Sequence, residues 1–280
     1  MLYIDQENGA ENLVAQLGAI KAGVQVVTFA EKENEDALDH ALRTTKAKGL
    51  LISPNSSVGE NKTRLSFLQS LMPELATMYA GDDLKLAKYP ALQHIVQTGF
   101  SNIRGVNMFK DLAVYTSPSL STYQIPQNNE DDVTHRVFRD GHEVATHTSG
   151  DIVSAADRLW RDFLHHSDGE DRIQNPIFMS VELESPLGFA SYLSCSTNFK
   201  KMFVPGSYNM SKMLKSIPRQ HSSIVVCDSD FYSLEVPPAA AAEYQEMCQG
   251  VSHALVAGKA GQTELFKNAQ AKSVDPFTLQ

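Results

Sequence analysis

The segment from Leu13 to Pro54 constrains the fold most strongly, because it reads as helix, strand, helix and strand in turn. Apolar residues at helical spacing precede Gly23, a residue suited to the left-handed conformation that ends many helices. The β-branched run Val24–Phe29 follows, and then a helix with acidic residues at its start and basic residues at its end, as the helix dipole favours. An apolar strand at 49–54 completes the unit. This pattern predicts parallel strands joined by helical crossovers.

The second half of the chain repeats this alternation. Asp151 is expected to cap a helix whose apolar face runs from Ile152 to Phe163. Further strands are expected over Ile177–Leu183, Met202–Val204, Ser223–Cys227 and Ala254–Val256, and helices over Leu187–Ser196, Ser211–Ile217 and Ala239–Cys248. Residues 117–133, rich in Ser, Pro, Asn, Gln and acids, have the composition of a linker or surface loop. The prediction is an α/β fold of mainly parallel sheets flanked by helices, in two packed subdomains at 1–116 and 134–280.

Composition and charge exclude several classes of protein. With 280 residues and 42% hydrophobic content, the chain can bury a large core. A net charge of −9 without a basic tract argues against nucleic acid or an anionic membrane as partner. No apolar run approaches the roughly 20 residues of a membrane span, and no secretory signal is recognisable. Three widely spaced cysteines suggest a reducing, intracellular compartment and give no metal-binding spacing.

Several short segments carry a resemblance to a known family. They are Leu17–Gly23, Ala47–Ile52, the strand Leu92–Gly99 ending in Thr-Gly, Phe109–Leu112, Pro186–Gly188, and Ile224–Cys227 leading to Phe231 and Tyr232. In this order they resemble the acyl-CoA synthetase and adenylate-forming (AMP-binding) enzymes, patchily from about Leu2 to Lys267. The resemblance implies the two subdomains of that family's large domain. It also implies a chain shortened at its front and lacking the small C-terminal catalytic domain.

The motifs that carry chemistry in the resembled family are missing from this sequence. That family holds the ATP triphosphate in a loop of Gly, Ser and Thr followed by Pro-Lys-Gly, but Thr134–Glu143 stands at this place with one glycine and two acidic residues. The family's Pro-x-x-His segment is replaced by Glu182–Gly188, which has no histidine and two carboxylates. The magnesium-binding Tyr-Gly-x-Thr-Glu motif would follow Ala254–Gln270, where the chain ends. No catalytic, cofactor-binding or metal-binding residue is therefore assigned, and no cofactor is expected.

Four other patterns have simpler structural interpretations. His142–His147 is one residue too long for the His-Glu-x-x-His zinc signature and fits a polar loop or strand better. Ala257–Thr263 lacks the first glycine of a phosphate loop and is interpreted as a helix-entry turn. His165 and His166 fit the solvated end of a helix, and Cys227 fits a small buried hydrophobe.

These observations favour a non-catalytic, acyl-CoA-synthetase-like pseudoenzyme over an enzyme. We expect an accessory or structural subunit of a larger intracellular complex, with protein subunits as partners and no membrane span of its own. The mitochondrion is preferred to the cytoplasm by analogy with relatives that act there. Two alternatives stay open: an ATP-dependent acyl-CoA or carboxylate ligase completed by another chain or domain, and an acyl- or CoA-binding module without turnover.

Overall fold

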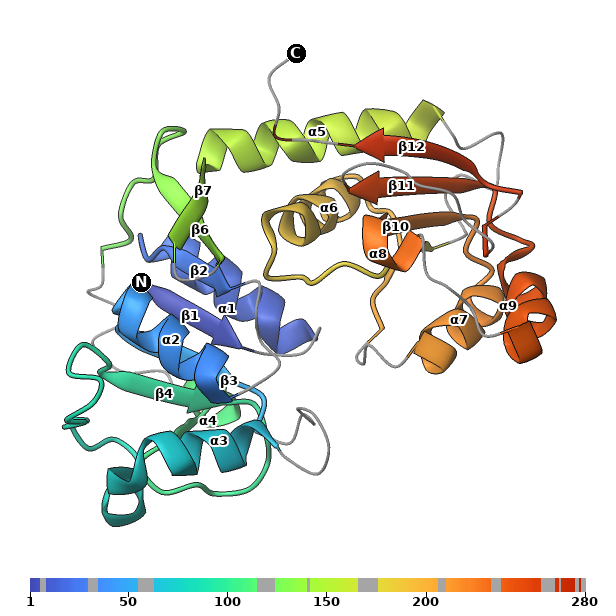
Figure 1. Ribbon diagram of the computed structural model, residues 1–280. Helices are drawn as coiled ribbons and strands as arrows, with labels where there is room; N and C mark the ends of the chain where they lie inside the picture. The colour runs from blue at the N-terminus through green and yellow to red at the C-terminus, as the bar shows by residue number, and fades with distance from the viewer. Residues whose placement is uncertain are drawn as a thin grey trace. The chain divides into compact units, whose positions relative to one another are not determined.

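The computed structural model describes residues 1–5, 9–29, 35–54, 63–114, 124–139, 142–165, 176–205, 210–232, 238–257, 265–266, 268–274 and 277. The chain forms two compact units, Met1–Ser149 and Gly150–Gln280. Each unit is built on its own β-sheet with helices against it (Figure 1). Within the described ranges, no helix is long and apolar enough to cross a membrane.

The first unit contains a seven-stranded sheet of order β5-β4-β3-β1-β2-β6-β7. Its strands are β1 (Leu2–Asp5), β2 (Val26–Phe29), β3 (Gly49–Ile52), β4 (His94–Gln97), β5 (Asn107–Met108), β6 (Val133–Arg139) and β7 (His142–Thr148). All neighbouring pairs are parallel except β6 and β7, which are antiparallel. The helices are α1 (Ala10–Lys21), α2 (Glu35–Thr45), α3 (Arg64–Leu71), a 3-10 helix (Pro73–Thr77) and α4 (Phe109–Val114).

Both faces of this sheet are covered, and the side chains of β3 alternate between them. Leu50 and Ile52 belong to the main core with Ala41 of α2, whereas Leu51 packs with Ala19 of α1 on the other side. Burial on both faces explains why this strand is apolar throughout instead of alternating with polar residues.

The second unit contains a parallel five-stranded sheet of order β12-β11-β10-β8-β9. Its strands are β8 (Ile177–Met179), β9 (Met202–Phe203), β10 (Ile224–Asp228), β11 (His253–Ala257) and β12 (Gln270–Val274). The helices are α5 (Ser149–His165), α6 (Pro186–Thr197), α7 (Met210–Arg219), α8 (Ser229–Tyr232), a 3-10 helix (Pro238–Ala240) and α9 (Ala241–Cys248). Residues of α7, α8 and α9 share one core with alternate residues of β10 and β11.

The predicted α/β class with mainly parallel sheets is confirmed, but several boundaries differ. The chain divides after Ser149, beyond the expected linker at 117–133, because β6 returns to pair with β2 and β7 pairs with β6. Residues 134–149 therefore belong to the first unit. Helix α5 begins at Ser149, so Asp151 lies in its first turn and is not its cap. The strand expected over 177–183 ends at Met179.

Candidate functional site

The segment Thr134–Glu143, where the resembled family places its phosphate loop, lies in the β6–β7 hairpin. The ladder continues to the pair Arg139 and His142, so only two residues connect the strands. On its other edge β6 pairs with β2 through residues 135–138. A loop that cradles a triphosphate needs several backbone N–H groups outside any ladder, usually on glycines. This hairpin commits its backbone to sheet pairing instead.

Arg136 is one of the two arginines of β6, and the other is Arg139 at the end of the strand. The Nε of Arg136 donates to Gln25 Oε1 at 2.7 Å, and its Nη1 donates to Glu143 Oε2 at 2.7 Å. The guanidinium is thus held between the loop before β2 and the opposite strand β7. The adjacent carboxylate already balances its charge, which leaves little net attraction for a phosphate group.

His135 is fully buried in a polar network between β6 and α1. Its Nε2 lies 3.2 Å from Gln16 Oε1, while Gln16 Nε2 donates to Asn12 Oδ1 at 2.7 Å. Its Nδ1 lies 3.1 Å from Thr134 Oγ1. Burial, aided by the nearby His147, lowers the pKa of His135 to about 3. The imidazole is therefore neutral near pH 7 and supplies no positive charge.

The zinc-like run His142–His147 forms strand β7, one of the two structures expected for it. His142 pairs with Arg139 at one end of the strand and His147 pairs with His135 near the other. Five strand residues span about 16 Å, several times the separation of two ligands on one zinc ion. In the described part of the chain, no group of three His, Cys, Asp or Glu side chains could hold a metal ion.

The segment Glu182–Gly188 forms the close-packed turn between β8 and α6. Ser185 Oγ donates to the carbonyl of Glu182 at 2.6 Å and accepts from Gly188 N at 3.0 Å, which caps α6. Glu184 is 1% exposed. A Cβ on Gly188 would lie 2.0 Å from the Glu182 carbonyl oxygen, so glycine is required there. The tight backbone packing makes this segment a structural turn at the carboxyl end of β8.

The three cysteines are free and buried in the second unit. Burial raises the pKa of the Cys195 and Cys248 thiols to about 12. Burial, followed by the nearby Asp228, also raises the pKa of Cys227. A thiolate is required for nucleophilic attack, so these groups are inert packing residues near neutral pH. Cys227 is thus the small buried hydrophobe that its strand predicted.

Two further sequence candidates lie at the edge of the described chain. Ala257 ends strand β11, and residues 258–263 of the phosphate-loop-like run lie outside the described residues. His165 is the last residue of α5, and His166 lies outside the described residues.

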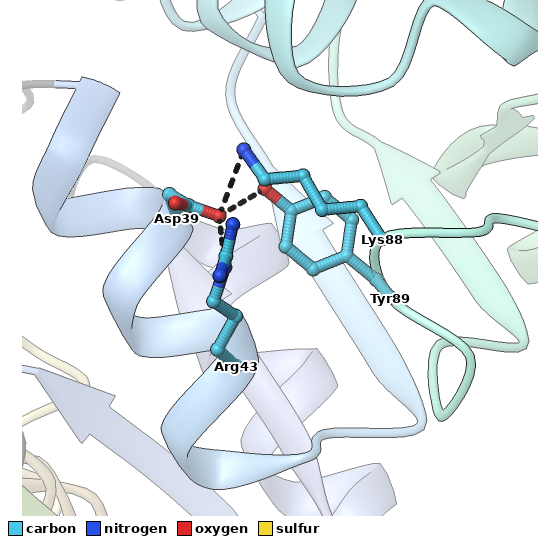
Figure 2. Close-up of polar contacts among 4 residues, drawn as sticks. All are labelled: Asp39, Arg43, Lys88 and Tyr89. Atoms are coloured by element: carbon cyan, nitrogen blue, oxygen red, sulfur yellow. Dashed lines mark hydrogen bonds and ion pairs between the residues drawn. The ribbon is translucent and has the colours of Figure 1, made fainter.

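Figure 2 shows a charged cluster in the first unit that sequence patterns did not predict. Asp39 Oδ1 on α2 accepts from Tyr89 Oη at 2.5 Å and from Arg43 Nε at 2.9 Å, and Lys88 Nζ lies 3.1 Å away. Partial burial alone would raise the pKa of Asp39, but the hydrogen bonds from Tyr89, Arg43 and Lys88 outweigh it and lower that pKa. Burial, followed by the contact with Asp39, raises the pKa of Tyr89. The cluster is an ion pair around a protonated phenol, and it ties α2 to the segment before β4.

Two surface pockets are further candidate sites. The first, of about 600 Å³, lies between α3, the following 3-10 helix and the 101–104 segment. Its lining is mainly apolar, with Leu68, Met72 and Ile103 among its residues. The second, of about 540 Å³, lies in the second unit and is lined by Pro176, Lys201, Met202, Phe203, Arg219, Gln220 and His221. Neither pocket was predicted from the sequence.

Solved structures identify the fold. A long-chain-fatty-acid CoA ligase assigned in Rhodopseudomonas palustris matches with a TM-score of 0.65 at 12% identity, over 96% of this chain and 61% of that protein. The luciferase-like enzyme of the nonluminescent mealworm Zophobas morio matches with a TM-score of 0.64 at 14% identity, over 96% of this chain and 58% of that protein. The chain has the fold of the adenylate-forming ligases. The O-succinylbenzoate coenzyme A synthetase of Bacillus subtilis gives a TM-score of 0.59 at 13% identity, over 95% of this chain and 46% of that protein.

This likeness establishes a ligase-type fold and nothing about activity, because the identities are low. No protein-family profile matches the sequence, and no curated protein sequence matches it. The chain spans 61% or less of the three solved ligase-type proteins named above. Function must therefore be inferred from what this chain's own residues can do.

Proposed function

We propose that the chain is a non-catalytic, acyl-CoA-synthetase-like pseudoenzyme that serves as an accessory or structural subunit of a larger protein complex. The β6–β7 hairpin carries the proposal. Two connecting residues and an antiparallel ladder that reaches Arg139 and His142, with two register shifts along it, stand where an adenylate-forming ligase needs a phosphate cradle. Stabilising charge at phosphorus is most of the catalytic task in phosphoryl and adenylyl transfer, so a fold without that cradle lacks its main catalytic device.

The charge states of Arg136 and His135 on β6 support the same proposal. Arg136 is paired with Glu143, and His135 is neutral near pH 7 because burial lowers its pKa to about 3. A nucleotide triphosphate carries several negative charges and needs uncompensated cations or a metal ion near its phosphates. Neither of these two side chains offers one.

Exposed apolar side chains around α4 favour a protein partner. Phe100 is 84% exposed and lies under Lys110 Nζ, which is 5.6 Å from the ring centroid. On the same helix as Lys110, Leu112 is 53% and Val114 is 83% exposed. Exposed apolar groups that gather on one element typically mark interaction surfaces. The net charge of −9 makes another protein a better occupant than nucleic acid or an anionic membrane.

We place the complex inside the cell, and in the mitochondrion in preference to the cytoplasm. The composition of the chain and the analogy with acyl-CoA synthetases that act in mitochondria support this placement. Import and fractionation of the tagged chain test it, and a purely cytoplasmic distribution would contradict it.

Two other functions have some support from specific observations. The ligase-type fold covers at least 95% of this chain in the three solved proteins named above, which favours an ATP-dependent ligase completed by another chain or domain. The 600 Å³ apolar pocket beside α3 favours a module that binds an acyl group without turnover. Calorimetry with fatty acids and CoA tests the second of these functions. Saturable acyl binding that Ala76→Arg abolishes would support the module over the accessory subunit, because Ala76 lines the pocket and is exposed.

Purification of the tagged full chain from its native source tests the accessory role. We expect a stoichiometric complex that survives size-exclusion chromatography and contains the same partner subunits in repeated preparations. Phe100→Asp combined with Val114→Asp should release the partners, because two desolvated apolar contacts become charged. Phe199→Asp is the matched control, since Phe199 is an exposed phenylalanine of the second unit, 92% exposed. A monodisperse, partner-free chain in its native source would contradict the proposal.

A further inference from the structure

The 540 Å³ pocket of the second unit lies at the amino-terminal ends of neighbouring strands. Pro176 precedes β8, Lys201 precedes β9, and Arg219 to His221 form the end of α7 and the turn that leads to β10. Its volume is within the usual range for small-molecule sites. In open α/β sheets, ligands typically bind at the carboxyl ends of the strands. This pocket is on the opposite edge and is therefore separate from any site inherited with the ligase-type fold.

The pocket is cationic in a chain that is otherwise strongly acidic. Lys201, Arg219 and His221 are three of its seven lining residues, and none of the seven is a carboxylate. Among the residues that the structure describes, the ion pairs use none of these three side chains. The carboxyl end of α7 contributes about half a negative charge, whereas Lys201 and Arg219 alone contribute two full positive charges. The site therefore keeps an excess of positive charge for an anion.

His221 is held in the pocket wall at a backbone cost. Its φ is +53°, in the left-handed region that glycine adopts freely and other residues avoid. Hydrogen bonds fix the turn around it: His221 N donates to Pro218 O at 3.1 Å, and Ser222 N donates to Ile217 O at 3.2 Å. This turn places His221 among the residues that line the pocket.

We propose that this pocket binds the phosphate group of a soluble, phosphorylated small molecule. Lys201 and Arg219 would bind the phosphate oxygens, with His221 as a further donor. Met202, Phe203 and Pro176 provide apolar surface for the remainder of the ligand. A phosphate monoester dianion can use two cations at once, whereas a single carboxylate can use only one of these charges fully. The net charge of −9 disfavours an anionic membrane as the source of the phosphate group.

Isothermal titration calorimetry of the full chain with inorganic phosphate and with phenyl phosphate tests this assignment at constant ionic strength. We expect saturable binding that is tighter for phenyl phosphate, because its ring adds contact with the apolar wall. Lys201→Gln combined with Arg219→Gln should weaken binding at least about tenfold. Lys215→Gln is the matched control, because Lys215 lies on α7 and pairs with Glu243 at 3.7 Å. The Lys215→Gln variant also removes a positive charge, but it should change phosphate binding less than about twofold.

A second pair of variants separates ligand binding from folding. His221→Gly should raise the melting temperature by relieving the left-handed strain while it weakens phosphate binding. Phe199→Gly relieves the same kind of strain at φ +54° and should raise the melting temperature without changing phosphate binding. A general effect of stability on binding would move both variants together and would overturn the role of the His221 ring.

The assignment fails if neither phosphate probe binds, or if the double variant binds as tightly as the wild type. Vesicles containing phosphatidic acid distinguish the source of the phosphate group. Co-sedimentation that depends on Lys201 and Arg219, in the absence of binding to the soluble probes, would overturn the soluble ligand in favour of a lipid headgroup.

Discussion

Replacement of Tyr89 by phenylalanine should weaken the first unit through one hydrogen bond. The 3% exposed Tyr89 donates to Asp39 Oδ1 at 2.5 Å, and hydrogen bonds to charged groups contribute about 1.5–3 kcal/mol. The other partners of Asp39 are more exposed, with 55% of the Arg43 side chain and 37% of the Lys88 side chain accessible to water. Solvent screens those ion pairs to about 1 kcal/mol or less. We therefore expect Tyr89→Phe to destabilise the unit by about 2 kcal/mol, and Arg43→Gln by less than half as much.

The difference in unfolding free energy between the wild type and Tyr89→Phe should depend on pH, both in the acidic and in the alkaline range. The pKa of Asp39 is lowered in the folded state, so its contribution is present above the unfolded value of about 4 and is lost as the pH falls through the folded value. The pKa of Tyr89 is raised, so the phenol's contribution is present below about pH 10 and is lost at higher pH. The difference should therefore be largest between about pH 4 and pH 10.

Hydrogen exchange is the suitable assay, because the only tryptophan, Trp160, lies on α5 in the second unit. Exchange of the α2 amides at several pH values, measured by mass spectrometry, reports the stability of the first unit directly. Tyr79→Phe is the matched control, since Tyr79 is 71% exposed and should change stability by less than about 0.5 kcal/mol. The reasoning would be refuted if the two substitutions changed the stability of the first unit equally. It would also be refuted if the stability lost in Tyr89→Phe did not vary with pH.

Two other substitutions test the packing described above. Gly188→Ala should destabilise the second unit by more than about 3 kcal/mol, because its Cβ would lie 2.0 Å from the Glu182 carbonyl oxygen. Gly250→Ala, with no atom within 4 Å of the added Cβ, should stay within about 1 kcal/mol of wild type when unfolding is followed by Trp160 fluorescence. Burial lowers the pKa of His135 to about 3 in the folded state. The contribution of His135 to folding stability is therefore present above the unfolded pKa near 6.5 and is lost as the pH falls below it, by up to about 1.4 kcal/mol per pH unit. His135→Gln should remove this slope between about pH 6 and pH 4 in urea titrations, and an unchanged slope would contradict the buried, neutral histidine.

The first four elements after β1 were predictable because their signals are local. Gly23 adopts φ +71° at the end of α1, as a helix-ending glycine should. The strand over 49–52 is apolar throughout, and it is buried between helices on both faces. Each of these features depends on residues that are neighbours in the sequence.

The hairpin and the unit boundary were not predictable from local patterns. Residues 117–133 have the composition of a linker, but the chain beyond them returns to β2 through contacts made more than 100 residues away, such as Arg136 with Gln25. The polar residues Thr134 and His135 look unsuited to a core strand until Gln16 supplies a partner. Strand β12 is equally polar, and only its pairing with β11 reveals it.

The candidate sites depend on similar long-range contacts. Tyr89 and Asp39 are 50 residues apart, and only the Asp39–Arg43 pair, four residues apart on α2, carries a local signal. The cationic pocket joins three segments that are separate in the sequence, at Pro176, at 201–203 and at 219–221. Local sequence patterns do not indicate that these segments meet.

Binding of ATP with magnesium to the isolated full chain tests the central claim most directly. We propose that the paired strands β6 and β7 replace the phosphate cradle, so calorimetry should detect no magnesium-dependent ATP binding with a dissociation constant below about 1 mM. Saturable binding in the micromolar range that disappears when magnesium is chelated would contradict the account and would indicate a working ligase site.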